Sequence, residues 1–254
     1  MRLIDLSLPI RSGPPGAPQH QRVALERSPH AEGARQIQAL FGLPPELLRD
    51  GEGWAVERFT SLGTHNVTHL DAPFHYNSTI DGRPARTIDQ LPLDWFLAPG
   101  VVLDMRHKPE GEAVTVADVE QALEGAGHEL CPRDIVLVHT GYDRFAFEPD
   151  YMTRGCGVSA EATLWLHLRG VRVMGIDAWG WDRPLQLQAR EALERGETGV
   201  FWAAHQAGIE YSQIERLTNL GALPPTGFTV VCFPLRVEGG SGAPARVVAM
   251  VEEG

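Results

Sequence analysis

Residues 65–75 contain three histidines and one aspartate in the spacing H-x3-H-x-D-x3-H, namely His65, His69, Asp71 and His75. Imidazole nitrogens and carboxylate oxygens are the ligands that borderline divalent metals bind, at about 2.0–2.2 Å for zinc. A helix cannot run through the whole segment, because Pro73 donates no backbone N–H and disfavours helical geometry at the residue before it. We therefore expect a short strand that runs into an irregular loop, with the four side chains directed at one metal site. A polar turn that holds hydrogen-bonded histidines is the competing interpretation.

The charge balance narrows the class of partner. The 254 residues include 22 Lys plus Arg and 33 Asp plus Glu, which gives a net charge of -11. An acidic chain is unsuited to nucleic acids and anionic membranes, so we expect neither as a partner. A small-molecule substrate or a cation fits this charge better.

The cysteines and the apolar runs indicate a cytoplasmic location. Cys131, Cys156 and Cys232 are far apart and form no C-x-x-C motif, which is typical of a reducing compartment. No apolar run is long enough to span a bilayer, and Arg2 and Asp5 interrupt the first residues where a signal peptide would be apolar.

Hydrophobic patterning predicts a single α/β domain over residues 1–254 with a mixed sheet. Strands alternate with helices in the middle and dominate both ends of the chain. The expected strands are 2–9, 55–60, 100–105, 134–139, 171–176, 228–233 and 245–251. The expected helices are 34–41, 115–124, 159–170 and 186–195. Thr115 with Asp118 and then Ser159 provide N-terminal caps, and Gly42, Gly170 and Gly196 provide stops.

Residues 11–54 form a long N-terminal excursion of loop and short helix. Such an insertion could cover a binding site, contact a second copy of the chain or be decoration, and the sequence does not choose among these.

A glycine motif in the middle of the chain offers a second interpretation. Residues 155–160 match G-x-G-x-x-A, and Asp177 follows 17 residues after Ala160, as in a nicotinamide-binding fold. That motif needs its first glycine at the tip of a strand, whereas residues 143–154 form a polar loop. We expect glycines that lead into a helix capped by Ser159.

His205 and two later glutamates complete the set of candidate ligands. Residues 202–217 predict a helix, a break near Gly208 and a second turn or helix. Within this stretch Glu210 and Glu215 compete as the distal carboxylate. Taken alone, each of these residues is more often a solvated surface group than a ligand.

The segment Thr68-His69-Leu70-Asp71-Ala72-Pro73-Phe74-His75, with His65 before it, resembles the T-H-x-D-x-P-x-H signature of the cyclase-type metal-dependent hydrolases. That family includes bacterial kynurenine formamidases and isatin hydrolases. The similarity extends along most of the chain, for example to Ile4-Asp5-Leu6-Ser7, Gly175-Ile176-Asp177 and Ile214-Glu215-Arg216-Leu217. It implies a swivelling β/β/α fold, a divalent metal site with one or two Zn²⁺ or Mn²⁺ ions per chain, and a homo-oligomer, dimer or tetramer.

The resemblance also implies roles by position. His65, His69 and Asp71 would hold a first metal, Asp71, His205 and Glu215 would hold a second, and His75 would be the general acid/base. Two departures are present. Val67 stands where many members have glycine, and His205 and Glu215 are ten residues apart instead of the usual twelve.

These residues favour a metal-dependent amidohydrolase that cleaves a carbon–nitrogen bond in a small amide, formamide or cyclic amide. A divalent cation lowers the pKa of bound water toward about 7 and polarises a carbonyl, so no nucleophilic serine or cysteine is needed. No serine lies in a G-x-S-x-G context. A metal-dependent lyase or cyclase and a non-catalytic metal-binding protein are the alternatives. The substrate-binding residues stay unknown: the aromatic candidates, for each of which a place in the core is the favoured interpretation, are Trp54, Phe74, Trp179 and Trp181.

Overall fold

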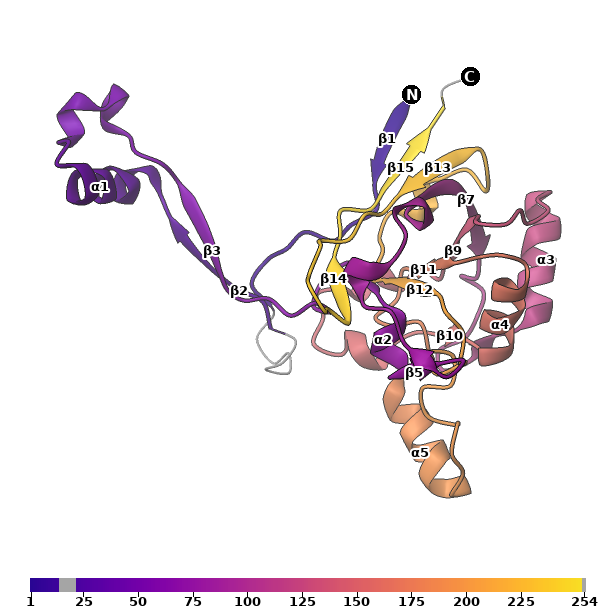
Figure 1. Cartoon of the computed structure of the whole chain (residues 1–254). Helices are drawn as coiled ribbons and strands as arrows, with labels where there is room; N and C mark the ends of the chain where they lie inside the picture. Colours follow the sequence, from indigo (N-terminus) through magenta and orange to yellow (C-terminus); the bar gives the residue numbers. More distant parts are fainter. Residues whose placement is uncertain (14–21, 253–254) are drawn as a thin grey trace. The chain divides into compact units, whose positions relative to one another are not determined.

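The computed structural model describes residues 1–13 and 22–252. The chain forms two compact units, one made of Met1–Pro9 with Thr64–Gly254 and the other of Ile10–Gly63 (Figure 1). The larger unit contains all the candidate metal ligands and His75. The smaller unit contains the predicted excursion.

A nine-stranded sheet organises the larger unit. Its strand order is β1-β15-β13-β7-β9-β11-β12-β4-β14. Strands β7, β9, β11 and β12 are parallel to one another, and all other neighbours pair antiparallel. The strands are β1 (Arg2–Asp5), β4 (His69–Asp71), β7 (Leu97–Asp104), β9 (Ile135–His139), β11 (Val173–Ile176), β12 (Ser212–Glu215), β13 (Phe228–Val231), β14 (Gly242–Pro244) and β15 (Val248–Val251). The predicted α/β class with a mixed sheet is confirmed, and the finer assignment to a swivelling β/β/α fold stays a prediction.

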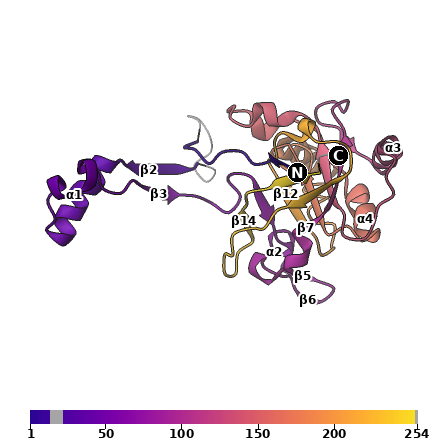
Figure 2. The same ribbon diagram turned by 90° about the horizontal axis from the view of Figure 1, so that it is seen from above.

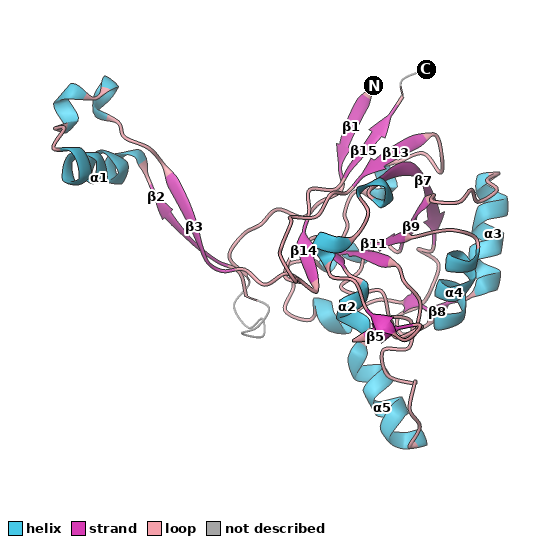
Figure 3. Ribbon diagram, viewed as in Figure 1, coloured by secondary structure: helices cyan, strands magenta, loops and turns pink. Residues whose placement is uncertain are grey.

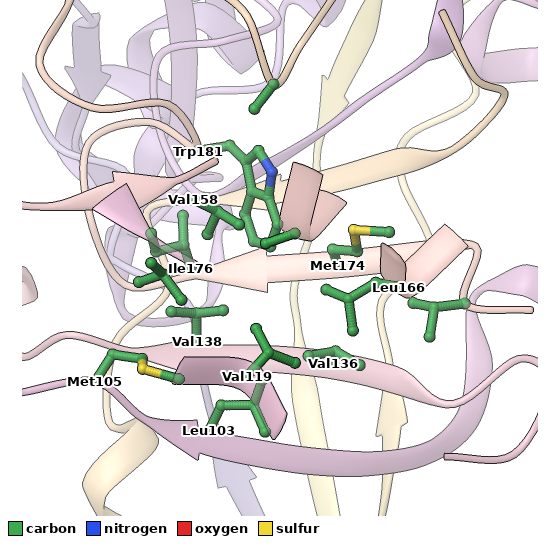
Figure 4. Packing of buried hydrophobic residues seen from close by; sticks show 14 of the residues in the cluster. Leu103, Met105, Val119, Val136, Val138, Val158, Leu166, Met174, Ile176 and Trp181 are labelled. Carbon is green, nitrogen blue, oxygen red and sulfur yellow. The ribbon is translucent and has the colours of Figure 1, made fainter. Parts of the chain in front are cut away.

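Both faces of this sheet are buried around β9 and β11, as the continuous apolar run of β9 requires. Val136 and Val138 point to one face, where α3 (Val116–Ala126) and α4 (Ala160–Leu168) cover the sheet (Figure 3). Val119 of α3 and Leu166 of α4 pack there, as Figure 4 shows. Ile135 and Leu137 alternate to the opposite face. Each fully buried aliphatic side chain contributes about 1.5–3 kcal/mol, so burial of these two faces is the main stabilising force in this unit.

The predicted helix boundaries agree with the observed caps. Thr115 and Asp118 form a reciprocal capping box at the start of α3, and the Ser159 hydroxyl accepts a hydrogen bond from Ala162 N at the start of α4. The helix α5 (Leu185–Arg195) ends at Gly196, whose backbone adopts the left-handed conformation. The remaining α-helix and strands of this unit are short: α2 (Pro73–Tyr76), β5 (Thr79–Ile80), β6 (Arg83–Pro84), β8 (Ala113–Val114) and β10 (Gly157–Val158).

The prediction of helices over residues 202–217 is wrong. Residues 200–209 form successive turns, and Ser212–Glu215 is a strand between β11 and β4. Every residue of this strand is buried, although three of the four are polar. These polar residues do not give the apolar pattern expected of a buried strand, because one face of β12 lines a polar site instead of an apolar core.

The glycine motif of residues 155–160 does not form a phosphate loop. As predicted, it leads into the Ser159-capped helix α4, and Gly157 lies in the short strand β10. A side chain at Gly157 would meet the backbone of Asp182 and Arg183 at 2.1–2.2 Å. Close packing against residues 182–183 therefore explains this glycine.

The smaller unit is a β-hairpin that carries a helix between its strands. β2 (Ala24–Ser28) pairs antiparallel with β3 (Val56–Ser61), and the two run side by side (Figure 2). The helix α1 (His30–Phe41) begins before its predicted start and ends, as predicted, at Gly42. Two 3₁₀ turns follow, Pro45–Leu47 and Arg49–Gly51. All six residues of β3 are exposed.

None of the helices in the described part of the chain is long and apolar enough to cross a membrane.

Candidate metal centre

Two adjacent strands bring the central candidate residues to one face. His69 and Asp71 are two residues apart on β4, so both side chains leave the same face while Leu70 between them enters the core. In the antiparallel pair of β4 and β12, Glu215 lies directly opposite His69. Directly opposed residues share a face, so the strand register places the carboxylate of Glu215 beside the histidine.

The segment after β4 supplies His75. The structure has a four-residue helix here, α2, where an irregular loop was predicted. Pro73 occupies its first turn, a position where the missing N–H costs no hydrogen bond. The His75 ring stacks on the His65 ring with centroids 4.0 Å apart.

All six predicted site residues converge. His65 Nδ1 lies 2.7 Å from Asp71 Oδ1, and His69 Nε2 lies 3.1 Å from the same oxygen. His205 Nε2 lies 3.7 Å from Asp71 Oδ2 and 3.3 Å from Glu215 Oε1. Two groups of ligand atoms each lie within 4.8 Å of one another: His65 with Asp71 and His75, and His69 with Asp71 and Glu215. Asp71 is common to both groups. Because His75 belongs to the first group, it could also act as a ligand.

Two buried polar atoms of the site lack hydrogen-bond partners in the described part of the chain. His69 Nε2 and Asp71 Oδ2 are buried and make no hydrogen bond among the described residues. An unsatisfied buried polar group costs about 1–3 kcal/mol, and more when it is charged. A divalent cation between these atoms would remove that cost. Nitrogen and carboxylate oxygen donors of this kind suit zinc and manganese alike.

The buried carboxyls are held in the ionised form. Burial opposes ionisation of Asp71, but the charge of His69, the nearby imidazole of His205 and the hydrogen bond with His65 bring its pKa well below the usual range. Burial and the charge of Asp71 both act to raise the pKa of Glu215, yet the hydrogen bond and charge of His205 bring it below its usual value. Two buried carboxylates side by side make a strongly cation-attracting site.

The histidines differ in their protonation. Burial lowers the pKa of His75 to about 4, against the opposing charge of Asp71. For His205 burial acts in the same direction, but its hydrogen bond to Asp182 and the nearby carboxylates raise its pKa well above the usual value. His75 is therefore a neutral imidazole at neutral pH.

Neighbouring groups orient two of the proposed ligands. The Nδ1–H of His69 donates to the Val67 carbonyl at 2.6 Å, which directs Nε2 at the site. His205 Nδ1 donates to the Asp182 carboxylate at 2.6 Å with the same result. Val67 is not among the described residues with positive φ, so its replacement of glycine is accommodated by ordinary backbone.

Sequence reasoning missed three supporting residues. Asp182 also accepts the backbone N–H groups of Ala204 and His205, at 3.1 and 3.0 Å. Ser241 Oγ lies 2.9 Å from His65 Nε2. A side chain at Gly242 would approach His65 Cε1 to 2.6 Å, so only glycine lets the histidine pack there. The glycine-rich stretch at residues 239–242 and the position of Asp182 shortly after β11 were the available signals.

Other candidates lie in different surroundings. Glu210 forms a two-point ion pair with Arg86, with N–O distances of 2.5 and 2.6 Å, so Glu215 is the glutamate that lies with the histidines. Asp177 accepts hydrogen bonds from Thr140 and Gly141 and ties down that loop. Trp181 is fully buried in the core, as the core interpretation predicted (Figure 4).

Comparison with known proteins gives consistent relatives. The chain is 28% identical to a kynurenine formamidase of Salinibacter ruber over 187 residues, covering 74% of this chain and 76% of the relative. It is 26% identical to an isatin hydrolase of Roseibium aggregatum over 201 residues, covering 75% of this chain and 73% of the relative. The solved structure of isatin hydrolase A from Labrenzia aggregata, bound to benzyl benzoate, superposes with a TM-score of 0.73 at 25% identity, covering 99% of this chain and 94% of that one.

A family model completes the comparison. The model described as "Putative cyclase" matches residues 4–183, a range that includes His65, His69, Asp71 and His75. This match extends over more than half of the chain and includes the strand and the short helix that supply most of the candidate centre. The chain therefore belongs to the cyclase family.

Proposed function

We propose that this protein is a metal-dependent amidohydrolase that cleaves a carbon–nitrogen bond in a small amide, formamide or cyclic amide. The buried cluster around Asp71, with two polar atoms that lack hydrogen-bond partners, is the observation that carries the proposal. The similarity to proteins named kynurenine formamidase and isatin hydrolase supports the class of reaction. The fully buried Cys232 and the buried Cys156, both with thiol pKa values raised by burial, are unsuited to act as nucleophiles.

The ligands divide into two sets that share one carboxylate. His65, His69 and Asp71 would hold one Zn²⁺ or Mn²⁺ ion, and Asp71, His205 and Glu215 would hold a second. A divalent cation held there would supply Lewis-acid chemistry, which polarises the amide carbonyl and makes water a nucleophile near neutral pH. Asp71 is central because its two oxygens face different histidines.

His75 would move the proton. Burial lowers its pKa to about 4, so the ring is unprotonated at neutral pH and has a lone pair that would accept a proton from the attacking water. The same nitrogen would then return the proton to the amine that leaves. Within residues 1–13 and 22–252 the His75 ring stacks on His65 and meets Trp202 edge-on but makes no hydrogen bond, so neither nitrogen is committed to a protein partner.

Two measurements test this proposal. Hydrolysis in ¹⁸O-labelled water is expected to place the label in the carboxylate product. His75→Ala is expected to retain its metal and to lose about 10²–10⁴-fold in kcat, since proton transfer and not binding is removed. His167→Ala, a half-buried histidine on α4, is the matched control and should behave as wild type.

Product without label would contradict hydrolysis and favour lyase or cyclase chemistry. If the His75→Ala variant does not retain metal, His75 is a metal ligand.

A further inference from the structure

Trp202 has an unusual backbone conformation beside the candidate centre. Its φ is 60°, in the left-handed region where a bulky side chain is an outlier. In the described part of the chain it is the only aromatic residue with a positive φ. Strained conformations of this kind persist where the surroundings over-determine them, and they cluster at functional sites.

Hydrogen bonds on both sides hold this strained residue in place. The Trp202 N–H donates to Gln188 Oε1 at 2.8 Å, and the Gln188 amide donates to the Arg183 carbonyl at 2.6 Å. Gln188 lies on α5 and is 2% exposed, so the anchor itself is buried. After Trp202, two backbone N–H groups donate to Asp182. The loop is therefore fixed at residue 202 and again at residues 204–205.

The indole of Trp202 contacts two histidines of the candidate centre. It stacks on His205 with centroids 4.5 Å apart and planes at 24°. It meets His75 edge-on, with centroids 5.0 Å apart and planes at 88°. The hydrogen bond to Asp182 fixes one point of the His205 ring, and the stacked indole fixes the plane of that ring. His75 depends more on such packing, because its ring has no hydrogen bond among the described residues.

Ordinary core packing does not account for this arrangement. Trp181 fills the core with an ordinary backbone conformation and a hydrogen bond from its indole to Thr163. Trp202 is half-buried and takes a disfavoured backbone conformation that brings its ring against two imidazoles.

We propose that Trp202 is a positioning residue that sets the ring planes of His205 and His75, the first for metal binding and the second for proton transfer. This inference rests on the proposed function. It assigns Trp202 no contact with the substrate, so its loss should lower kcat and metal affinity and leave KM nearly unchanged.

The test compares Trp202→Ala and Trp202→Phe with the wild-type protein. Zn²⁺ affinity is measured by competition with a chelator, and kcat and KM are measured separately with a formamide substrate. Trp202→Ala is expected to lose about 10–100-fold in Zn²⁺ affinity and in kcat, as other changes to groups that orient metal ligands do. Trp202→Phe should restore most of both, because a flat ring is retained. Trp165→Ala is the control, since Trp165 is half-buried on α4 and lies over Arg169 instead of an imidazole.

Wild-type Zn²⁺ affinity and kcat in Trp202→Ala would overturn the proposal, and so would equal losses in Trp202→Ala and Trp202→Phe. If Trp202→Ala does not fold, the Gln188→Ala variant tests the proposal instead, because it removes the hydrogen bond to the Trp202 N–H and leaves the indole in the protein. It should lower kcat, and an unchanged kcat would overturn the inference. A wild-type protein that neither binds Zn²⁺ nor hydrolyses amides would instead contradict the proposed function itself.

Discussion

At the scale of single residues, the histidines nearest the centre are held by groups that would not bind the metal. The Val67 carbonyl orients His69, and the Asp182 carboxylate orients His205. Such partners fix the tautomer and the direction of the ligating nitrogen. The shape of the centre therefore depends on residues outside the ligand set.

Asp182→Asn is expected to weaken Zn²⁺ binding by about 10–100-fold, because the amide cannot provide the negative charge that orients His205. Chelator competition measures the change. Asp134→Asn is the matched control, since Asp134 is also buried and its carboxylate lies 2.7 Å from His128 Nε2. This pair is not part of the candidate centre. Equal affinities in the two variants would contradict the role given to Asp182.

The candidate ligands could be predicted from the sequence, whereas the residues that contact and orient them could not. His65, His69, Asp71 and His75 lie within eleven residues, and strand periodicity is enough to direct His69 and Asp71 to one side. The contacts of Ser241 and Gly242 depend on β14 pairing with β4, which joins residues more than 170 positions apart. No local pattern encodes such a register.

At the scale of elements, β12 and the caps show what local patterns can and cannot predict. The start of α3 follows from Thr115 and Asp118 alone, because a capping box is satisfied within four residues. The strand β12 contains Glu215, which faces the centre, and Ser212, whose hydroxyl donates to the Asp71 carbonyl, so its sequence lacks the apolar signal of a buried strand. The strand that carries the proposed ligand Glu215 was therefore mispredicted, because its polar residues belong to the site.

The exposed hairpin strand leads to a prediction about assembly. An isolated two-stranded sheet is only marginally stable in water, and β3 exposes Val56 and Phe59 by 45% and 50%. We expect the protein to form a homo-oligomer, a dimer or tetramer, in which β3 contacts a second copy of the chain. Sedimentation of the double variant Val56→Thr, Phe59→Ser should show a shift toward monomer.

Leu168→Ser is the control for that shift, because Leu168 on α4 is 73% exposed and belongs to the other unit. A wild-type protein that sediments as a monomer at every concentration would end this expectation.

At the scale of the whole molecule, the mixed sheet brings the candidate ligands of β4 and β12 together at one buried site. Strands that are distant in the sequence meet there because β12 and β4 are neighbours near one end of the sheet. The alternation of strands and helices was enough to predict the α/β class. The strand order was not predictable, because it is decided by long-range pairing.

Metal content and its removal test the central claim most directly. Protein purified without added metal is expected to contain one or two equivalents of Zn²⁺ or Mn²⁺ per chain. Chelation should abolish amide hydrolysis, and added Zn²⁺ or Mn²⁺ should restore it, whereas His69→Ala should neither bind the metal nor recover. Full carbon–nitrogen hydrolysis by the metal-free protein would contradict the account.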